Sequence, residues 1–213
     1  TQATGEKRAY TKEEEKQLVE FAKGHKYGAQ IIVMLRLGLR RGEMLGLMPE
    51  DINYLKKTVS IKRSVYSVNG NVRVGVPKTA GSVTDQPMDE DTRAALMGVS
   101  LFTESGNKKE FLFGNTRGKV MSPDNGAKRV YPVFMADYEA YCKENKLKCR
   151  ILNPHELRHT YGSLIYEATG DIYITSKLMR HADIKITAKT YVHETMATKH
   201  AALAQVLEFR QRV

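Results

Sequence analysis

The apolar segment from Ile31 to Leu47 constrains the fold more than any other part of the sequence. Its pattern fits a buried helix, a break around Gly38 and a second helix that starts at Arg41. The longest uninterrupted apolar run, from Ile31 to Leu35, is far too short to cross a bilayer. The segment therefore predicts helices in the interior of a globular domain, and we expect no membrane partner.

The rest of the chain predicts a mixed α+β fold that is mainly α-helical, with a small three-stranded antiparallel sheet. The capping box at residues 11–14 predicts a helix over 12–23 that ends at Gly24. Alternating Val, Ile and Tyr residues predict strands, which we place over 58–66, 72–76 and 83–88. Further helices are predicted over 89–99, from 123 with an interruption near 132, and over 154–170, 172–179, 184–191 and 195–212.

The charge balance favours a nucleic-acid partner. The 34 Lys and Arg residues outnumber the 24 Asp and Glu residues, which gives a net charge of +10 and a pI of about 9.5. A pI above about 9 is the electrostatic signature of nucleic-acid binders, although a basic but otherwise ordinary protein would have the same balance. If a basic face follows DNA phosphates, binding should fall steeply as the salt concentration rises.

The densest group of chemically useful side chains is the run HELRH at residues 155–159. As HExxH, the run has the two His and the general-base Glu of zinc proteases. As HxxR, it places His155 and Arg158 on one face of a helix, where an Arg fork suits a phosphate. The zinc interpretation needs a third ligand, and the downstream His and Glu residues fall at no spacing typical of such enzymes. A helix start with solvated side chains is the structural alternative.

Four other positions stand out, and each has an ordinary structural explanation beside a functional one. Arg40 follows a Gly-Leu break, where it can point into a cleft or pair at the surface with Glu43 or Glu50. Lys78 lies at a predicted hairpin tip, where it can reach a DNA groove or remain solvated. His181 lies between two helical patterns and could be a capping or core residue, and Tyr191 could be a packing residue.

Taken in order, these residues resemble the tyrosine recombinase family, the integrases of phages and mobile elements. The family pattern is an Arg, a Lys on a β-hairpin, His-x-x-Arg, a second His and a Tyr. In this chain it reads Arg40 in LGLRRGEMLGL, Lys78 in VPKTAGS, His155 and Arg158 in NPHELRHTYGS, His181 in LMRHADIKIT, and Tyr191 in AKTYVH. The resemblance covers roughly residues 10 to 195, and six residues in this order make it specific.

The resemblance implies a tyrosine recombinase catalytic-domain fold. We assign residues 1–10 to a linker, 11–193 to the catalytic domain and 194–213 to a helical C-terminal tail. In the family such a tail often docks on a neighbouring protomer, although packing on its own domain is the alternative. The implied partners are double-stranded DNA and other protomers in a recombination synapse. We expect a cytoplasmic, nucleoid-associated protein of a bacterial host, which agrees with two cysteines that we interpret as free thiols.

The resemblance also implies a mechanism without cofactor or metal. Two Arg forks, Arg40 and Arg158, would clamp the non-bridging oxygens of the phosphodiester, with His181 as a further donor. Tyr191 would attack the phosphorus, and His155 would act as its base or as another phosphate contact. Lys78 would protonate the departing 5′ oxygen. The product would be a 3′-phosphotyrosine and a free 5′ hydroxyl, and rejoining would require no ATP.

The chain departs from the family pattern at three places. Position 180, directly before the second His, is commonly Gly and is Arg here. A basic residue is common shortly after the hairpin turn, where this chain has Val83, Thr84 and Asp85, so Lys78 is the least secure assignment. We find no N-terminal core-binding domain in the chain, and we expect it to be a fragment.

The sequence leaves rival functions open. A type IB topoisomerase resembles the same active site and would relax supercoils without a specific DNA site. A DNA-binding module that has lost activity would bind DNA and form no covalent adduct. A zinc hydrolase would bind one zinc per chain at HExxH. We expect site-specific recombination, the integration or excision of a mobile element, because the boxes are integrase-like.

Overall fold

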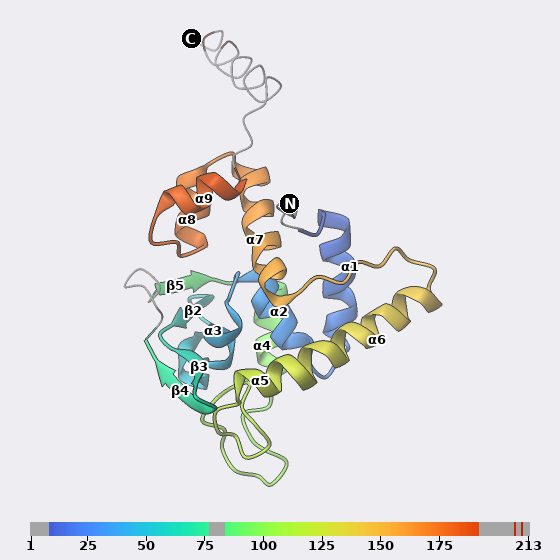
Figure 1. Ribbon diagram of the computed structural model, residues 1–213, viewed down its shortest axis with the longest axis vertical. Coiled ribbons are helices and arrows are strands. Elements are labelled where there is room, and N and C mark those ends of the chain that lie inside the picture. Colours follow the sequence, from blue (N-terminus) through green and yellow to red (C-terminus); the bar gives the residue numbers. More distant parts are fainter. Residues whose placement is uncertain (1–8, 77–83, 192–206, 208–209, 211–213) are drawn as a thin grey trace.

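A computed structural model of the chain describes residues 9–76 and 84–191, together with residues 207 and 210. The structure is mainly helical with a small antiparallel sheet, as expected (Figure 1). In this part of the chain the α-helices are α1 (Lys12–Lys23), α2 (Gly28–Arg36), α3 (Arg41–Leu45), α4 (Glu90–Met97), α5 (Pro123–Asn125), α6 (Tyr131–Glu144), α7 (Pro154–Thr169), α8 (Ile172–Leu178) and α9 (Ile184–Tyr191).

Short local signals set most of the helix ends. Thr11 and Glu14 form the expected capping box at the start of α1. At the start of α7, the Asn153 side chain accepts hydrogen bonds from two backbone amides, and the Glu156 carboxylate accepts one from the Asn153 amide. Gly170 ends α7 with φ of +63°, a conformation that glycine adopts without steric cost. The predicted interruption near Pro132 is a π-helical turn over Gly126–Val130 between α5 and α6.

The strands differ from the prediction in how they pair. The three-stranded sheet has the order β1 (Ile52–Asn53), β2 (Thr58–Ile61) and β5 (Thr84–Pro87), and its neighbours are antiparallel. A separate hairpin pairs β3 (Ser64–Val68) with β4 (Asn71–Gly75). The prediction of one continuous strand over 58–66 was therefore wrong, and the two-residue strand β1 was missed.

The break between β2 and β3 has an electrostatic cause. Lys62 and Arg63 reach the Asp51 carboxylate, with Nζ–Oδ1 and NH1–Oδ2 distances of 3.1 Å and 2.6 Å. Asp51 is buried, so two cations on one carboxylate offset its loss of hydration. In a regular strand, successive side chains point to opposite faces of the sheet. Lys62 and Arg63 both reach Asp51, so the chain cannot continue as a regular strand through these two residues.

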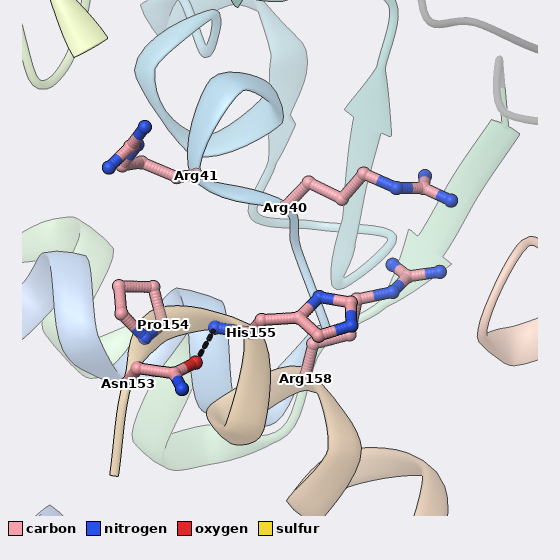
Figure 2. A pocket seen from close by; sticks show the side chains of 6 residues that line it. All are labelled: Arg40, Arg41, Asn153, Pro154, His155 and Arg158. Atoms are coloured by element: carbon pink, nitrogen blue, oxygen red, sulfur yellow. Dashed lines mark hydrogen bonds between the residues drawn. The ribbon is translucent and has the colours of Figure 1, made fainter. Parts of the chain in front are cut away.

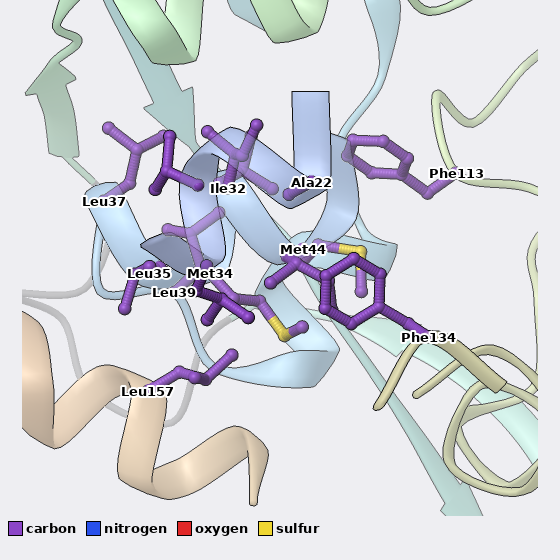
Figure 3. Close-up of a cluster of buried hydrophobic side chains, with 14 of the residues drawn as sticks. Ala22, Ile32, Met34, Leu35, Leu37, Leu39, Met44, Phe113, Phe134 and Leu157 are labelled. Carbon is purple, nitrogen blue, oxygen red and sulfur yellow. The ribbon is translucent and has the colours of Figure 1, made fainter. Parts of the chain in front are cut away.

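Helix α2 lies in the middle of the core, as its apolar sequence predicts. Ile31, Ile32 and Leu35 are fully buried, and α2 packs against α1, α4 and α7. Figure 3 shows Leu157 of α7 facing the end of α2 and the chain that follows it. The helix that carries the HELRH run is therefore anchored directly on the central helix.

The expected break after α2 is a left-handed turn at Gly38, where φ is +56°. A Cβ atom at this position would come within 2.3 Å of the Tyr161 ring, so the close approach of α7 requires glycine as well. The turn exposes backbone carbonyl groups to the space between α3, α7 and the loop after α8. The part of the chain that the structure describes contains no helix long and apolar enough to cross a membrane.

Candidate active site

A polar pocket of about 340 Å³ opens between the start of α3 and the start of α7. Its lining comprises Arg40, Arg41, Asn153, Pro154, His155 and Arg158. Figure 2 shows the guanidinium groups of Arg40 and Arg158 on the same side, beside the His155 imidazole, whereas Arg41 points away from them. Three of the residues predicted from the sequence therefore meet in one basic pocket, although they come from segments more than a hundred residues apart.

Arg158 is built into the core. Its side chain is 2% exposed, and its two terminal nitrogens donate to the carbonyl oxygens of Gly38 and Met179. Burial lowers the pKa of Arg158, and the neighbouring Arg180 and Arg40 lower it further. The guanidinium nevertheless stays protonated at neutral pH. Arg158 thus brings a fixed positive charge to the bottom of the pocket.

Arg40 is held in a different way. Its side chain is 45% exposed, and its NH1 nitrogen lies 2.6 Å from the Oε1 oxygen of Glu43, so the pairing considered from the sequence is confirmed. The Arg40 backbone amide donates to the same carboxylate at 2.9 Å. Arg40 caps α3 and keeps its guanidinium open to solvent at the mouth of the pocket.

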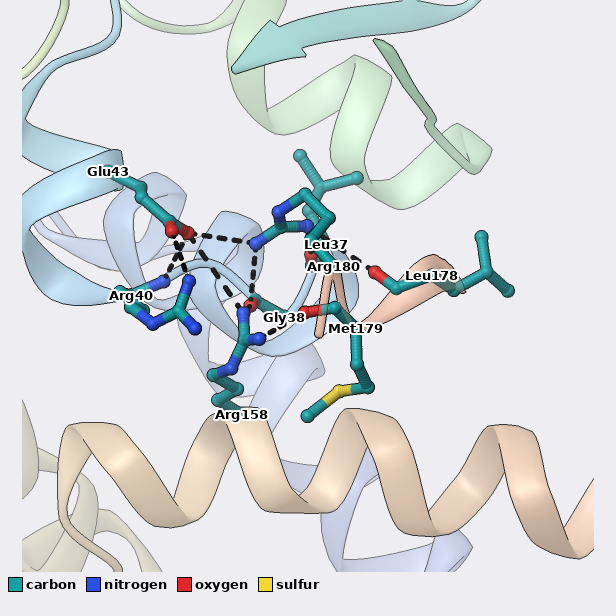
Figure 4. A network of polar contacts seen from close by, with 8 residues as sticks. All are labelled: Leu37, Gly38, Arg40, Glu43, Arg158, Leu178, Met179 and Arg180. Atoms are coloured by element: carbon teal, nitrogen blue, oxygen red, sulfur yellow. Dashed lines mark hydrogen bonds and ion pairs between the residues drawn. The ribbon is translucent and has the colours of Figure 1, made fainter. Parts of the chain in front are cut away.

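One buried carboxylate connects the arginines (Figure 4). The Oε2 oxygen of Glu43 lies 2.8 Å from Arg180 NH2 and 4.0 Å from Arg158 NH1. Burial alone would raise the pKa of Glu43, but Arg180, the Arg40 amide and the other two arginines lower it overall. Glu43 is therefore ionised and offsets part of the positive charge around it.

His181 lies in the loop between α8 and α9. Its Nδ1 atom is 2.7 Å from the Thr187 hydroxyl oxygen. Burial, followed by the charges of Arg158 and Arg40, lowers the pKa of His181 to about 4. The imidazole is therefore neutral at physiological pH, and one ring N–H can donate a hydrogen bond to an anion.

Tyr191 ends α9 and packs on α7. Its hydroxyl group lies 3.2 Å from the Nδ1 atom of His159, and the residue is 8% exposed. Burial raises the pKa of Tyr191 to about 12, although the charge of Arg158 acts in the opposite direction. A Cβ atom at Gly162 would come within 2.3 Å of the Tyr191 hydroxyl, so the ring rests on the backbone of α7.

The structure brings together five of the six predicted residues and adds others. Lys78 lies outside the described residues. Sequence reasoning missed His159 as the partner of Tyr191, although its spacing of one helical turn from His155 was a usable signal. The imidazole centroids of His155 and His159 are 4.5 Å apart in a T-shaped arrangement. Reasoning also missed the network role of Arg180, for which a basic residue directly before His181 was the only signal.

The zinc interpretation of the HELRH run gains no support from this geometry. Glu156, which the zinc interpretation requires as the general base, instead accepts a hydrogen bond from the Asn153 backbone amide at 2.7 Å and caps the start of α7. Among the residues that the structure describes, no three His, Cys, Asp or Glu side chains gather in a way that could hold a metal ion.

Comparison with sequence families gives one match over most of the chain. Residues 8–198 match the phage integrase family. A tyrosine recombinase XerC-like protein of Caldanaerobacter subterraneus is 26% identical over 202 residues, which cover 86% of this chain and 50% of that protein. The transposase of transposon Tn916 from Enterococcus faecalis is 27% identical over 219 residues, covering 97% of this chain and 53% of the transposase. The chain thus spans about half the length of these relatives.

Comparison with solved structures identifies the same fold. An integrase of transposon Tn1549, solved in complex with transposon right end DNA, superposes with a TM-score of 0.78 at 22% identity. The match covers 96% of this chain and 67% of the integrase. The XerA recombinase superposes with a TM-score of 0.61 at 20% identity, covering 96% of this chain and 65% of that protein.

Proposed function

The chain belongs to the phage integrase family of tyrosine recombinases, and from this premise we propose that it catalyses site-specific recombination of a mobile element. The proposed reaction breaks and rejoins double-stranded DNA through a covalent bond between Tyr191 and a DNA phosphate. Residues 11–193 would form the catalytic domain. The family fixes the general class of chemistry, and the arrangement of side chains around the pocket supports the assignment of roles.

The observation that carries the proposal is the convergence of two guanidinium groups and an imidazole on one pocket. Arg40, His155 and Arg158 line it together, and the charge of Arg158 acts on both His181 and Tyr191. A phosphodiester spreads negative charge over its non-bridging oxygens as it is attacked. Guanidinium groups fixed before the reaction stabilise that charge with little reorganisation. We therefore assign the clamp to Arg40 and Arg158, with neutral His181 as a further hydrogen-bond donor.

In the proposed step, the Tyr191 oxygen forms a bond to phosphorus while the bond from phosphorus to the 5′ oxygen breaks. The tyrosine proton passes to a base, and the 5′ oxygen gains a proton from Lys78. The hydrogen bond between Tyr191 and His159 adds His159 as a second candidate base beside His155. The products are a 3′-phosphotyrosine and a 5′ hydroxyl, and the reverse step rejoins a strand.

Without DNA, Tyr191 is a weak nucleophile. Its hydroxyl is buried against α7, and its pKa of about 12 leaves it fully protonated at neutral pH. DNA binding would have to bring the hydroxyl to the phosphate in the pocket, beside the charge of Arg158. We propose that cleavage requires this rearrangement, and that the charge of the arginines serves where other nucleases use a metal ion.

A trapping experiment tests the proposal. Nicked duplexes tiled across both ends of the element that encodes the chain are incubated with the protein in EDTA, and the products are separated on a denaturing gel. Loss of the short 5′ fragment at the nick traps the cleaved state. We expect a slowly migrating protein–DNA band that Tyr191→Phe abolishes. If the full-length gene product binds the duplexes and gives no band, the chain is an inactive DNA-binding module and the proposal fails.

Two further outcomes separate the remaining alternatives. Relaxation of a supercoiled plasmid that carries none of the element's ends would favour a topoisomerase of type IB. Strand exchange that needs two such ends would favour recombination. We also propose that other protomers join in a synapse. The tail at 194–213 lies largely outside the described residues, and sedimentation of the DNA complex with and without it tests whether it connects protomers; unchanged assembly would exclude that role.

A further inference from the structure

Arg180 adopts a backbone conformation that favours glycine. Its φ is +54°, in the left-handed region where a side chain clashes with the following carbonyl group. Its guanidinium group is fully buried, with 0% of the side chain exposed. Both features oppose folding, because backbone strain and the burial of a charge are each unfavourable. An arginine at such a position needs compensating contacts.

The guanidinium of Arg180 makes those contacts with the turn after α2 (Figure 4). NH1 donates to the Leu37 carbonyl at 3.1 Å, and NH2 donates to the Gly38 carbonyl at 3.0 Å. NH2 also lies 2.8 Å from the Oε2 oxygen of Glu43. The contacts span more than 130 residues of sequence and join the loop before α9 to the segment that carries Arg40.

Arg158 also holds the loop between α8 and α9 against the turn at Gly38. It donates to the carbonyl of Met179, the residue before Arg180, and to the carbonyl of Gly38. The Gly38 carbonyl thus accepts from both guanidinium groups. The residue that follows Arg180 is His181, so the clamped turn leads directly into the proposed phosphate-binding side chain.

From these contacts we infer that Arg180 is a positioning residue for the reaction proposed above. It pairs with the Oε2 oxygen of Glu43, so that the carboxylate attracts Arg40 and Arg158 less strongly, and it fixes the turn that carries His181. The inference rests on the proposed function for its chemistry. The geometry itself is independent of that function.

The charge balance explains why an arginine is needed. Glu43 is 1% exposed and has three guanidinium groups within 4.0 Å. Without Arg180, the carboxylate would retain Arg40 and Arg158 as its sole cations among the described residues. The buried carboxylate would then compete with the DNA phosphate for the same two groups. Arg180 weakens this competition, because it gives the carboxylate a fully buried cation that does not line the pocket.

A double-mutant cycle between Arg180 and Glu43 tests the inference. Arg180→Gly relieves the backbone strain but leaves Glu43 with only Arg40 and Arg158 as nearby cations among the described residues. Glu43→Gln leaves Arg180 without its counter-ion. The double variant removes both charges. We expect Arg180→Gly to slow single-turnover formation of the covalent band between about tenfold and a hundredfold, the effect typical of small misplacements in an active site. The double variant should recover about tenfold of that loss, because contacting charges are coupled.

Two controls distinguish positioning from a general contribution to stability. Lys146→Gly removes a positive charge from an exposed residue with the same φ of +54°, and should leave the cleavage rate within about twofold of wild type. Arg180→Lys keeps the charge but loses the planar fork, so it should recover part of the rate. The midpoint of thermal unfolding is measured for each variant, to verify that the variant is folded at the temperature of the cleavage assay.

The same double-mutant cycle is repeated in the Tyr191→Phe background with DNA affinity as the readout. The inference can then be decided even if the chain with Tyr191 forms no covalent band. We expect Arg180→Gly to weaken binding to the nicked duplex and the double variant to restore it. Additive losses in both readouts, or an Arg180→Gly variant equal to wild type, would overturn the inference. If the full-length gene product also gives no band while the affinity pattern is as predicted, the proposed catalysis is refuted and the positioning role stands.

Discussion

The two sides of the candidate site are built in different ways. On the arginine side, Arg158 and Arg180 are fully buried and are held by the carbonyl groups of Leu37, Gly38 and Met179. On the tyrosine side, Tyr191 is attached to α7 through its contact with His159 and its packing on Gly162. Arg158, the innermost group proposed to bind the phosphate, belongs to the core, whereas the proposed nucleophile Tyr191 ends α9 and rests against α7.

The fold therefore holds the charge-stabilising groups in place before DNA binds, and it holds the nucleophile less rigidly. Charge stabilisation is most effective when donors are held in place before the reaction, because no reorganisation is then needed. A nucleophile that must attack, remain attached to DNA and later leave benefits from a movable support. Substitution of a buried arginine should therefore affect stability and cleavage together, and substitution of the exposed Arg40 should affect mainly cleavage. A substitution beneath Tyr191 should change the surroundings of the nucleophile and leave the phosphate-binding groups in place.

The largest effect is expected for Arg158→Ala. The change removes the guanidinium donor of the Met179 carbonyl, leaves the Gly38 carbonyl with Arg180 alone, and removes the innermost charge of the pocket. We expect cleavage to fall by at least about a thousandfold and the free energy of unfolding to fall by roughly 3 kcal/mol or more. Single-turnover cleavage and urea denaturation measure the two quantities. A stable variant with near wild-type cleavage would show that the buried arginine is not part of the clamp.

Arg40→Ala is the matched change at the exposed end of the pocket. Arg40 would contact the same phosphate, but its side chain is half-exposed and the buried Glu43 keeps Arg180 after the change. The Arg40–Glu43 pair should therefore contribute about 1 kcal/mol or less to stability. We expect cleavage to fall between about a hundredfold and a thousandfold, with little change in urea denaturation. Loss of stability equal to that of Arg158→Ala would contradict the distinction between a buried and an exposed arm of the clamp.

Gly162→Ala tests the tyrosine side. The added methyl group would lie 2.3 Å from the Tyr191 hydroxyl, so the ring has to move off α7. We expect a loss of about 1–3 kcal/mol in stability and a decrease of the Tyr191 pKa from about 12 toward its ordinary value of 10, observed by ultraviolet titration against Tyr191→Phe. At Gly24 a Cβ would have no neighbour nearer than 4.0 Å, so Gly24→Ala is the control. An unchanged titration would mean that Tyr191 does not rest on Gly162.

The smallest expected effect is a pH dependence from His181. Its pKa is about 4 in the folded chain and about 6.5 when unfolded, so the unfolded chain binds more protons between these values. Stability should therefore be unaffected above pH 7 and should fall by about 1–2 kcal/mol as the pH drops to 4, because the ring is only partly buried. Urea denaturation of wild type and His181→Asn at both pH values isolates this contribution. Identical pH profiles would contradict the lowered pKa.

The sequence predicted the parts of the fold that depend on local signals. The capping box of α1, the ends of α7 at Pro154 and near Gly170, the break at Gly38 and the apolar pattern of α2 are each determined by a few neighbouring residues, and all were predicted. The break between β2 and β3 was not predicted, because it depends on a buried carboxylate at Asp51 that lies outside the strand. Local alternation carries no information about such a partner.

The candidate site shows the same division. The order of Arg40, His155, Arg158, His181 and Tyr191 made the pocket predictable as a set of residues. Their partners were not predictable, because the contacts of Glu43 with Arg180 and of His159 with Tyr191 join segments far apart in sequence. Arg180 was noticed only as a departure from a pattern, and its role emerges from where its guanidinium lies in the fold. The role of Lys78 stays a prediction, since the residue lies outside the described part of the chain.

The most direct test of the account locates the covalent bond itself. The trapped protein–DNA complex is digested with nuclease and trypsin, and the peptides are sequenced by tandem mass spectrometry. Cleavage after Lys189 and Lys199 gives the peptide 190–199, in which Tyr191 is the only tyrosine. The account predicts that this peptide carries a nucleotide linked through the Tyr191 oxygen. A nucleotide on any other residue of the chain would contradict the assignment of the nucleophile and, with it, the proposed mechanism.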